Sequence, residues 1–133
     1  MPQQKKIVGL IEGVKIIGRK TVKATALFDT GAKLSSIDTE LAAKAQLGPV
    51  IRTQKVKAPI TKHTVERPVV KVIFEIAGER YDTEANLNDR SHMKYPIIIG
   101  RNLIKGNFVV DVDKNPRDVK RADEKAKGMD NSS

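Results

Sequence analysis

The feature that most constrains this chain is a series of short apolar segments, separated by turns, that fills residues 6 to 112. From residue 21 to 28, Val22, Ala24, Ala26 and Phe28 occupy every second position, as in a strand that buries one face. Further strands are expected at residues 6 to 11, 14 to 17, 50 to 56, 65 to 76, 80 to 87, 95 to 100 and 107 to 112, with turns at Gly13, Gly18-Arg19 and residues 77 to 79. The pattern predicts a mostly β fold.

Helical signals are confined to two places. Residues 38 to 48 begin with the N-cap residue Asp38, continue with helix formers and end at a glycine, which predicts one short helix. Residues 102 to 105 are expected to form a single further turn. The wholly apolar run before it, from 95 to 100, is typical of a strand buried on both faces.

Composition limits the size and surroundings of the fold. The 133 residues suffice for one domain, which we place at residues 1–113, followed by a disordered, charged tail at residues 114–133. The absence of cysteine excludes disulfides, iron–sulfur clusters and thiolate zinc sites. No signal peptide or membrane helix is readable near the N-terminus, so a cytoplasmic location is expected.

The chain is strongly basic. Its formal charge is +9, and without the tail the body still carries 19 basic and 12 acidic residues, a charge of +7. A field of this sign favours acidic partners, whether nucleic acid, anionic lipid or a carboxylate-rich peptide.

The tripeptide Asp29-Thr30-Gly31 is a candidate for a catalytic turn. Asp29-Thr30-Gly31 follows the alternating strand directly, and about seventy residues later a second apolar strand ends in Gly100-Arg101-Asn102. An Asp-Thr-Gly alone is an ordinary turn sequence, but an ordinary turn does not require the second segment.

Two motifs carry a resemblance to a known family: Leu-Phe-Asp-Thr-Gly-Ala at 27–32 and Ile-Ile-Ile-Gly-Arg-Asn-Leu at 97–103. They resemble the retropepsins, the homodimeric aspartic proteases of retroviruses and their cellular relatives. Four longer segments resemble a small retropepsin-like family long labelled "putative ATP-dependent zinc protease". They are Gly-Leu-Ile-Glu-Gly-Val, Asp-Thr-Gly-Ala-Lys-Leu-Ser-Ser-Ile, Glu-Arg-Pro-Val-Val and Leu-Asn-Asp-Arg-Ser-His-Met-Lys-Tyr-Pro-Ile-Ile-Ile-Gly-Arg.

This resemblance implies a β-rich, barrel-like fold that is closed, has one short helix and assembles as a homodimer. It also implies aspartic peptidase activity without a cofactor or metal. Some relatives are associated with ATP-grasp ligases that add glutamate tails to a ribosomal protein, which implies an acidic, glutamate-tailed substrate and a link to that ribosomal protein.

The resemblance also implies roles for individual residues. Asp29 would meet its own copy across a two-fold axis, Thr30 would hydrogen-bond across that axis, and Gly31 would let the backbone approach the substrate. The segment Ile99, Gly100, Arg101 and Asn102 would support the turn from behind. Residues 107 to 112 would interleave with the partner, although an ordinary edge strand fits their composition equally well.

Lys33 departs from the retroviral pattern, which carries an acidic residue four positions after the aspartate. In the retroviral enzymes this acidic residue pairs with the arginine that corresponds to Arg101. Arg101 therefore needs another partner here, and Asp89 and Asp111 are the candidates. Ala32 and Lys33 are expected to contact substrate, and a solvent-facing lysine is the alternative.

The stretch from 52 to 67, where retroviral enzymes have a glycine-rich flap, has no glycine and is basic. It is a candidate lid, in which Arg52, Lys62, His63 and Arg67 would bind an acidic substrate. A merely solvated, charged face is the alternative.

Three other functions stay open. The charge and size suit an RNA- or ribosome-binding β-barrel module, although only three Phe and two Tyr are available for base stacking. A retropepsin-fold adaptor without catalysis is the second alternative. The third is a zinc peptidase that uses His63, His92 and a carboxylate, although no His-Glu-x-x-His or phosphate loop occurs.

Overall fold

The computed structural model describes residues 4–57 and 63–114. The predicted tail lies outside these residues except for Lys114, and so does Lys62 of the candidate lid.

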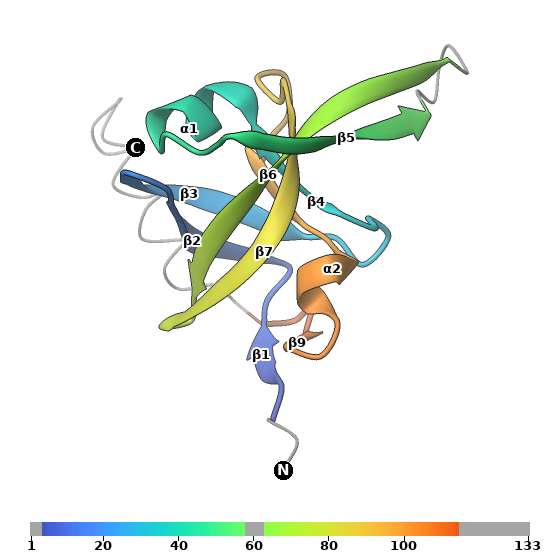
Figure 1. The fold of residues 1–133 in the computed structure, drawn as a ribbon. Helices are drawn as coiled ribbons and strands as arrows, with labels where there is room; N and C mark the ends of the chain where they lie inside the picture. The colour runs from blue at the N-terminus through green and yellow to red at the C-terminus, as the bar shows by residue number, and fades with distance from the viewer. Residues whose placement is uncertain (1–3, 58–62, 115–133) are drawn as a thin grey trace, which may run out of the picture.

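The described residues form a β-rich fold with two short helices (Figure 1). The strands are β1 (Lys6–Val8), β2 (Ile11–Ile17), β3 (Thr21–Phe28), β4 (Ser35–Asp38), β5 (Val50–Lys57), β6 (Thr64–Ile76), β7 (Glu79–Asn88), β8 (Ile97–Ile99) and β9 (Phe108–Val110). The helices are α1 (Thr39–Lys44) and α2 (Arg101–Ile104). The predicted mostly β fold is therefore confirmed.

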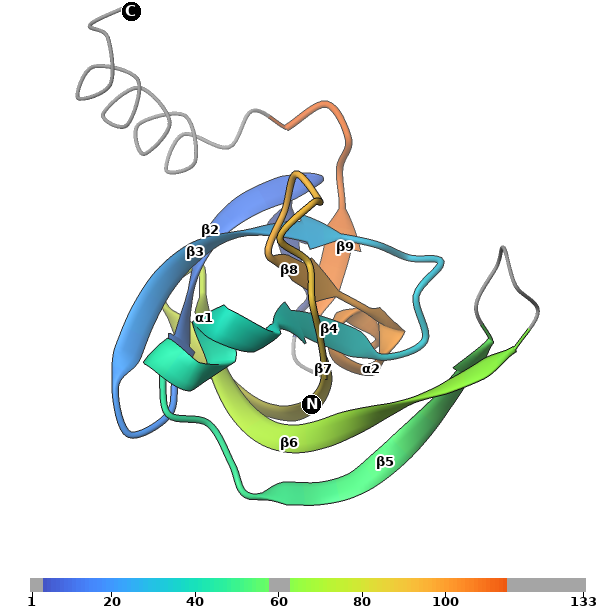
Figure 2. The same ribbon diagram turned by 90° about the horizontal axis from the view of Figure 1, so that it is seen from above.

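Six strands close into a barrel in the order β2-β3-β8-β4-β7-β6, because β6 also pairs with β2. Closure satisfies the backbone groups that open sheet edges would leave unpaired. β5 pairs with β6 outside this ring, and the two form a long arm that extends to one side of the barrel, as both views show (Figures 1 and 2). The sequence predicted closure only through the family resemblance.

Barrel closure is marked by an ionic contact across the seam between β2 and β6. Lys15 lies opposite Glu75 in the register, and its Nζ is 3.2 Å from a carboxylate oxygen of Glu75. Arg80 of β7 approaches the same carboxylate at 3.6 Å. The hydrogen bond from Lys15 is the largest cause of a lowered Glu75 pKa, and the charges of both cations act in the same direction.

The core lies inside the barrel and follows the strand alternation. Phe28 of β3 and Phe74 of β6 are buried, and all three residues of β8 are buried as predicted. Burying one such side chain stabilises the fold by about 1.5–3 kcal/mol. Phe108 of β9 packs edge-on against Phe28 with 5.5 Å between ring centroids, which fixes β9 beside the end of β3.

Three local predictions need correction. Gly13 is not a turn, because it lies within β2 opposite Thr25 of β3. The helix predicted over 38 to 48 is capped by Asp38 as expected but spans only Thr39–Lys44, and the chain then turns through Gln46 at a φ of 55°. β4 escaped prediction because its first two residues are serines, yet both are buried.

β1 and β9 form a separate two-stranded parallel sheet within one chain. Residues 107 to 112 were expected to make a strand, and the strand is present over Phe108–Val110. Ile7 of β1 and Val109 of β9 leave 56% and 48% of their surface exposed.

Candidate active site

Asp29 lies where two parallel strands end together. β3 and β8 pair in parallel, with Phe28 opposite Ile99, so the residues that follow each strand meet at one edge. The backbone amide of Asp29 donates to the carbonyl oxygen of Ile99 at 2.8 Å. The two sequence motifs, seventy residues apart, are thereby brought side by side.

The turn itself is held by hydrogen bonds within it. The amide of Gly31 donates to Oδ1 of Asp29 at 2.9 Å, and the amide of Ala32 donates to the carbonyl oxygen of Asp29 at 3.1 Å. Asp29 is half-buried, whereas Thr30 and Gly31 are exposed. A carboxylate is therefore presented at the surface in a fixed orientation.

The Gly100 segment grips the other side of the turn. The amides of Arg101 and Asn102 donate to the carbonyl oxygens of Ala32 (2.8 Å) and Lys33 (3.2 Å). A Cβ at Gly100 would lie only 2.7 Å from the carbonyl carbon of Leu34, so a side chain has no room there. Glycine is thus required by the close approach of two backbones.

Asn102 ties this segment to the rest of the barrel. Its Oδ1 accepts hydrogen bonds from both the amide and the hydroxyl of Ser35, each at 2.9 Å. Its Nδ2 donates to Oγ1 of Thr83 and to the carbonyl oxygen of Glu84. The Ser35 hydroxyl in turn accepts from the amide of Gly100 at 3.0 Å. The polar atoms of buried Ser35 are thus satisfied beside the turn.

Arg101 has a different partner from the two that were expected. Its Nη1 donates to the carbonyl oxygen of Thr30 at 3.1 Å. Asp89 instead accepts from the amide of Ser91, and hydrogen bonding to Ser91 lowers the Asp89 pKa. Asp111 accepts from the amide of Asp113. The guanidinium of Arg101 therefore braces the backbone of the turn without a carboxylate.

The register of the arm sorts the candidate lid residues onto two faces. Arg67 lies opposite Gln54, whereas the neighbouring pair, Lys55 and Glu66, points to the other face. Gln54 turns inward, since its Oε1 accepts from Nδ2 of Asn86 on β7 at 2.7 Å. Arg67 shares that inward face.

The other candidate lid residues are placed differently from Arg67. Arg52 is paired with Glu84 at 2.7 Å, so a carboxylate of the same chain already meets its charge. His63 is exposed just before β6 begins, and Lys62 lies outside the described residues. Lys33 is exposed beside the Asp29 turn, and Ala32 is half-buried.

Arg90 is a further candidate residue that the sequence analysis did not single out. It follows the end of β7, its amide donates to Oδ1 of Asp38 at 2.8 Å, and its Nε donates to the carbonyl oxygen of Tyr95 at 3.0 Å. Burial lowers its pKa most, the charge of Arg67 lowers it further, and the charges of Asp38 and Asp29 raise it. Arg90 is therefore within electrostatic reach of both the arm and Asp29. Two signals were available: its place after a strand, and its presence in the segment Leu-Asn-Asp-Arg-Ser-His that carries part of the family resemblance.

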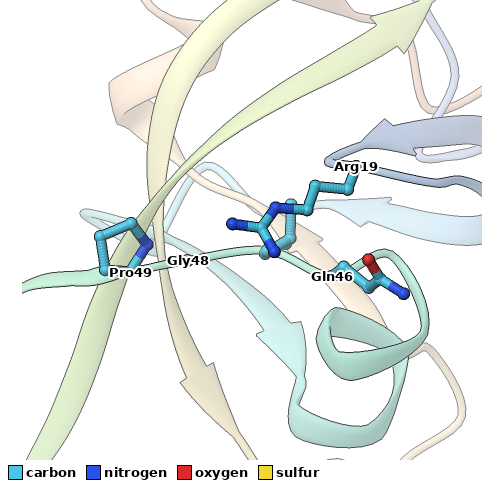
Figure 3. A pocket seen from close by; sticks show the side chains of 5 residues that line it. Arg19, Gln46, Gly48 and Pro49 are labelled. Atoms are coloured by element: carbon cyan, nitrogen blue, oxygen red, sulfur yellow. The ribbon is translucent and has the colours of Figure 1, made fainter.

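A surface pocket lies elsewhere, between the turn that joins β2 to β3 and the loop after α1 (Figure 3). Arg19, Gln46, Leu47, Gly48 and Pro49 line it, and the side chain of Arg19 extends over the loop. Arg19 precedes the start of β3 (Thr21–Phe28), whereas Asp29 follows its opposite end. We therefore do not assign this pocket to the Asp29 site.

The described residues lack two kinds of feature. Residues 4–57 and 63–114 contain no group of three or more His, Cys, Asp or Glu side chains that could hold a metal ion. No helix in the part of the chain that the structure describes has the length and apolar character needed to cross a membrane.

Comparisons with known proteins place these motifs in a wider context. The model of a family described as RimB-like, retropepsin-like aspartic endopeptidase RimB, matches residues 37–120, which is more than half of the chain. The matched region includes the Gly100 segment and begins after the Asp29 turn. A search of curated proteins found no match.

Several solved structures share the fold. A Legionella pneumophila protein of unknown function, Lpg0085, has a TM-score of 0.61 at 20% identity, over 85% of this chain and 98% of that one. EIAV protease complexed with the inhibitor HBY-793 has a TM-score of 0.57 at 20% identity, over 74% and 89%. Simian foamy virus protease has a TM-score of 0.52 at 17% identity, over 69% and 88%. The barrel is therefore retropepsin-like.

Proposed function

The chain belongs to the RimB-like family of retropepsin-like aspartic endopeptidases, and from this premise we propose that it is an aspartic peptidase that works as a homodimer through Asp29. The observation that carries the proposal is the Asp29 turn. Its carboxylate stands half-buried at the surface, and Ile99 and Arg101 grip the backbone on both sides.

The chemistry needs two carboxylates that share one proton. One deprotonates a water molecule that attacks the scissile carbonyl carbon, and the other protonates the carbonyl oxygen. The chain has a single Asp-Thr-Gly, so the second carboxylate is the Asp29 of an identical subunit. Thr30, exposed next to it, would hydrogen-bond across the two-fold axis, and Gly31 would leave room for the substrate backbone.

The sheet of β1 and β9 is the proposed contact between subunits. Its exposed apolar residues, Ile7 and Val109, would be buried by a partner, and both of its strands have an edge to offer. Phe108 connects this sheet to the catalytic turn, because it packs on Phe28, the residue before Asp29. Dimerisation would thus assemble the active site.

An acidic peptide is the proposed substrate, in particular the glutamate tail of a protein such as a ribosomal protein. The body of the chain has an excess of seven positive charges, which attracts such a tail. Exposed Lys33 follows the catalytic turn directly and would face an acidic side chain. Ala32 and the basic arm would complete the groove, with exposed His63 just before β6. Lys62, outside the described residues, stays a predicted contact of the same substrate.

The decisive experiment compares Asp29→Asn with the wild type on a fluorogenic oligo-glutamate peptide. We expect kcat/KM to fall roughly a thousandfold or more, since the reaction loses its acid–base pair. Asp82→Asn, which neutralises an exposed carboxylate on β7, is the matched control and should cleave normally. Circular dichroism and sedimentation must show that Asp29→Asn folds and assembles like the wild type. Undiminished cleavage by that variant would sink the proposal.

A further inference from the structure

We propose that Arg67 and Arg90 together form a carboxylate-binding subsite beside Asp29, which holds an acidic side chain of the substrate next to the bond that is cut. The proposal deepens the function proposed above and rests on it. It assigns the selection of acidic substrates to two residues of the chain instead of to its overall charge.

The two arginines reach the site from different elements. Arg67 lies on β6, on the inward face of the arm that it shares with Gln54. Arg90 lies in the loop that follows β7. The hydrogen bond from Asn86 to Gln54, the residue opposite Arg67, connects the arm to β7, and Arg90 follows the end of β7. Asn86 also accepts from Ser36, which pairs with Ile98, one residue before the strand end that meets Asp29. The charges of Arg67 and Asp29 shift the pKa of Arg90 in opposite directions, which agrees with this placement. An arginine from the arm and one from the barrel thus converge near the catalytic carboxylate.

Both arginines keep donors to spare. The Nε of Arg67 is buried and has no hydrogen-bond partner among the residues that the structure describes. Arg90 uses its amide and its Nε, and neither of its Nη atoms makes a hydrogen bond within residues 4–57 and 63–114. A buried donor without an acceptor is unfavourable, and so are two neighbouring positive charges. A carboxylate bound through the Nη atoms would offset the repulsion between the two charges.

The surroundings fix the strand beside Arg67 and the side chain of Arg90. Gln54, opposite Arg67, is fixed by Asn86, whose Oδ1 in turn accepts from the hydroxyl of Ser36 at 2.7 Å. This chain of hydrogen bonds connects the arm to β4, the strand that follows the catalytic turn. Arg90 is oriented by Asp38 and by the carbonyl oxygen of Tyr95. Arg90 is therefore preorganised, which lowers the entropy lost on binding.

Other arginines near the turn differ in this respect. Arg52 already has the carboxylate of Glu84 at 2.7 Å, and Arg101 donates to the carbonyl oxygen of Thr30. Arg67 and Arg90 form no ion pair within 4.0 Å in the described part of the chain. A guanidinium binds a carboxylate through two parallel hydrogen bonds, so a planar carboxylate is the ligand that best matches these donors.

The test measures binding separately from cleavage. In the Asp29→Asn background, which prevents turnover, we expect Arg67→Gln and Arg90→Gln each to weaken binding of a hexaglutamate peptide at least tenfold. Binding of the isosteric hexaglutamine peptide should stay within twofold. Lys71→Gln, which removes the same charge from an exposed position on β6, should change neither affinity by more than twofold. Fluorescence anisotropy at constant ionic strength gives the affinities.

The outcomes distinguish the two proposals. If Asp29→Asn abolishes cleavage but the arginine variants bind hexaglutamate no worse than Lys71→Gln does, the subsite is wrong and the peptidase function stands. An equal loss for both peptides also overturns the subsite. If the wild type cleaves no glutamate peptide, the proposed function fails. Should Arg90→Gln not fold, Arg67→Gln decides, and Arg67→Lys should show an intermediate loss because lysine keeps the charge without the fork.

Discussion

At the scale of single residues, the site depends on buried serine and asparagine side chains. In a sequence, these residue types usually indicate turns and not strands. Ser35 is fully buried and Ser36 and Asn86 nearly so, and each finds a hydrogen-bond partner inside the fold. Buried polar side chains are tolerated when they are satisfied in this way. They give the turn a fixed frame that apolar packing alone would not specify.

Gly100 offers the sharpest residue-scale prediction. A methyl group there would meet the carbonyl carbon of Leu34 at 2.7 Å and the carbonyl oxygen of Ala32 at 2.9 Å, both backbone atoms that cannot rotate away. We expect Gly100→Ala to lower the free energy of unfolding by about 2 kcal/mol, a typical cost of overpacking. It should also impair peptide cleavage, because the turn must shift. Urea unfolding and peptide kinetics measure the two effects.

Gly106→Ala is the matched control. Gly106 has a φ of 82° but nothing within 4 Å of its absent Cβ. The substitution should cost about 1 kcal/mol of backbone strain and leave cleavage unchanged. If Gly100→Ala proves as mild as Gly106→Ala, the close approach of the two backbones is not what requires glycine.

Local signals made part of the site predictable. Asp29 follows an alternating strand and Gly100 ends an apolar one, and both facts are visible within a few residues. The convergence of Arg90 with Arg67 was not predictable, because it depends on how β7 ends relative to the arm. Likewise, a rule that pairs Arg101 with a carboxylate overlooked the carbonyl oxygen of Thr30, an acceptor that no sequence letter reveals.

At the scale of elements, the strands expected after residue 20 lie within one or two residues of their observed ends. The strand expected at residues 6 to 11 ends at Val8, and the one expected at 14 to 17 begins at Ile11. β4 was missed because its Ser-Ser start lacks β-branched residues, and Gly13 was taken for a turn although β2 continues through it. In both cases pairing with neighbouring strands outweighs local propensity. Pairing partners are distant in the chain, so the closing contact of β2 with β6 could not be derived from the pattern.

That seam between β2 and β6 predicts a pH dependence of stability. The pKa of Glu75 is lowered in the folded state, mainly by the hydrogen bond from Lys15. The carboxylate therefore contributes stability above its ordinary pKa of 4.5, and this contribution is lost as the pH falls through the lower, folded value. We expect Glu75→Gln to lower Tm at pH 7 and to reduce the further loss of Tm between pH 7 and pH 3.

Thermal unfolding of both proteins across this range checks the prediction. Asp82→Asn, which alters an exposed carboxylate on β7, should follow the wild-type profile. If Glu75→Gln loses as much Tm on acidification as the wild type does, another group is responsible for the acid sensitivity of the barrel.

At the scale of the whole molecule, the proposed function requires two copies of the chain, and the exposed sheet of β1 and β9 predicts where they meet. Replacing Val109, which is 48% exposed, by aspartate would place a charge in an apolar contact. We expect Val109→Asp to raise the dimer dissociation constant at least tenfold, in line with the loss of a central interface residue. Cleavage should then become concentration-dependent over the same range. Sedimentation velocity gives the association state.

Val50→Asp provides the comparison, because Val50 is similarly exposed, at 53%, but lies at the start of β5. It should leave the dimer intact. Dissociation by both variants, or by neither, would show that the contact between subunits lies elsewhere.

The hydrogen bonds that fix the Asp29 turn affect how substrate preference can change in this fold. The hydrogen bonds that connect the turn to Ile99, Arg101 and Asn102 run largely between backbone atoms. Side chains at Ala32 and Lys33 can therefore change without releasing the carboxylate. A new preference for substrate could arise by single substitutions at these two positions, while the geometry of the reacting group is inherited unchanged.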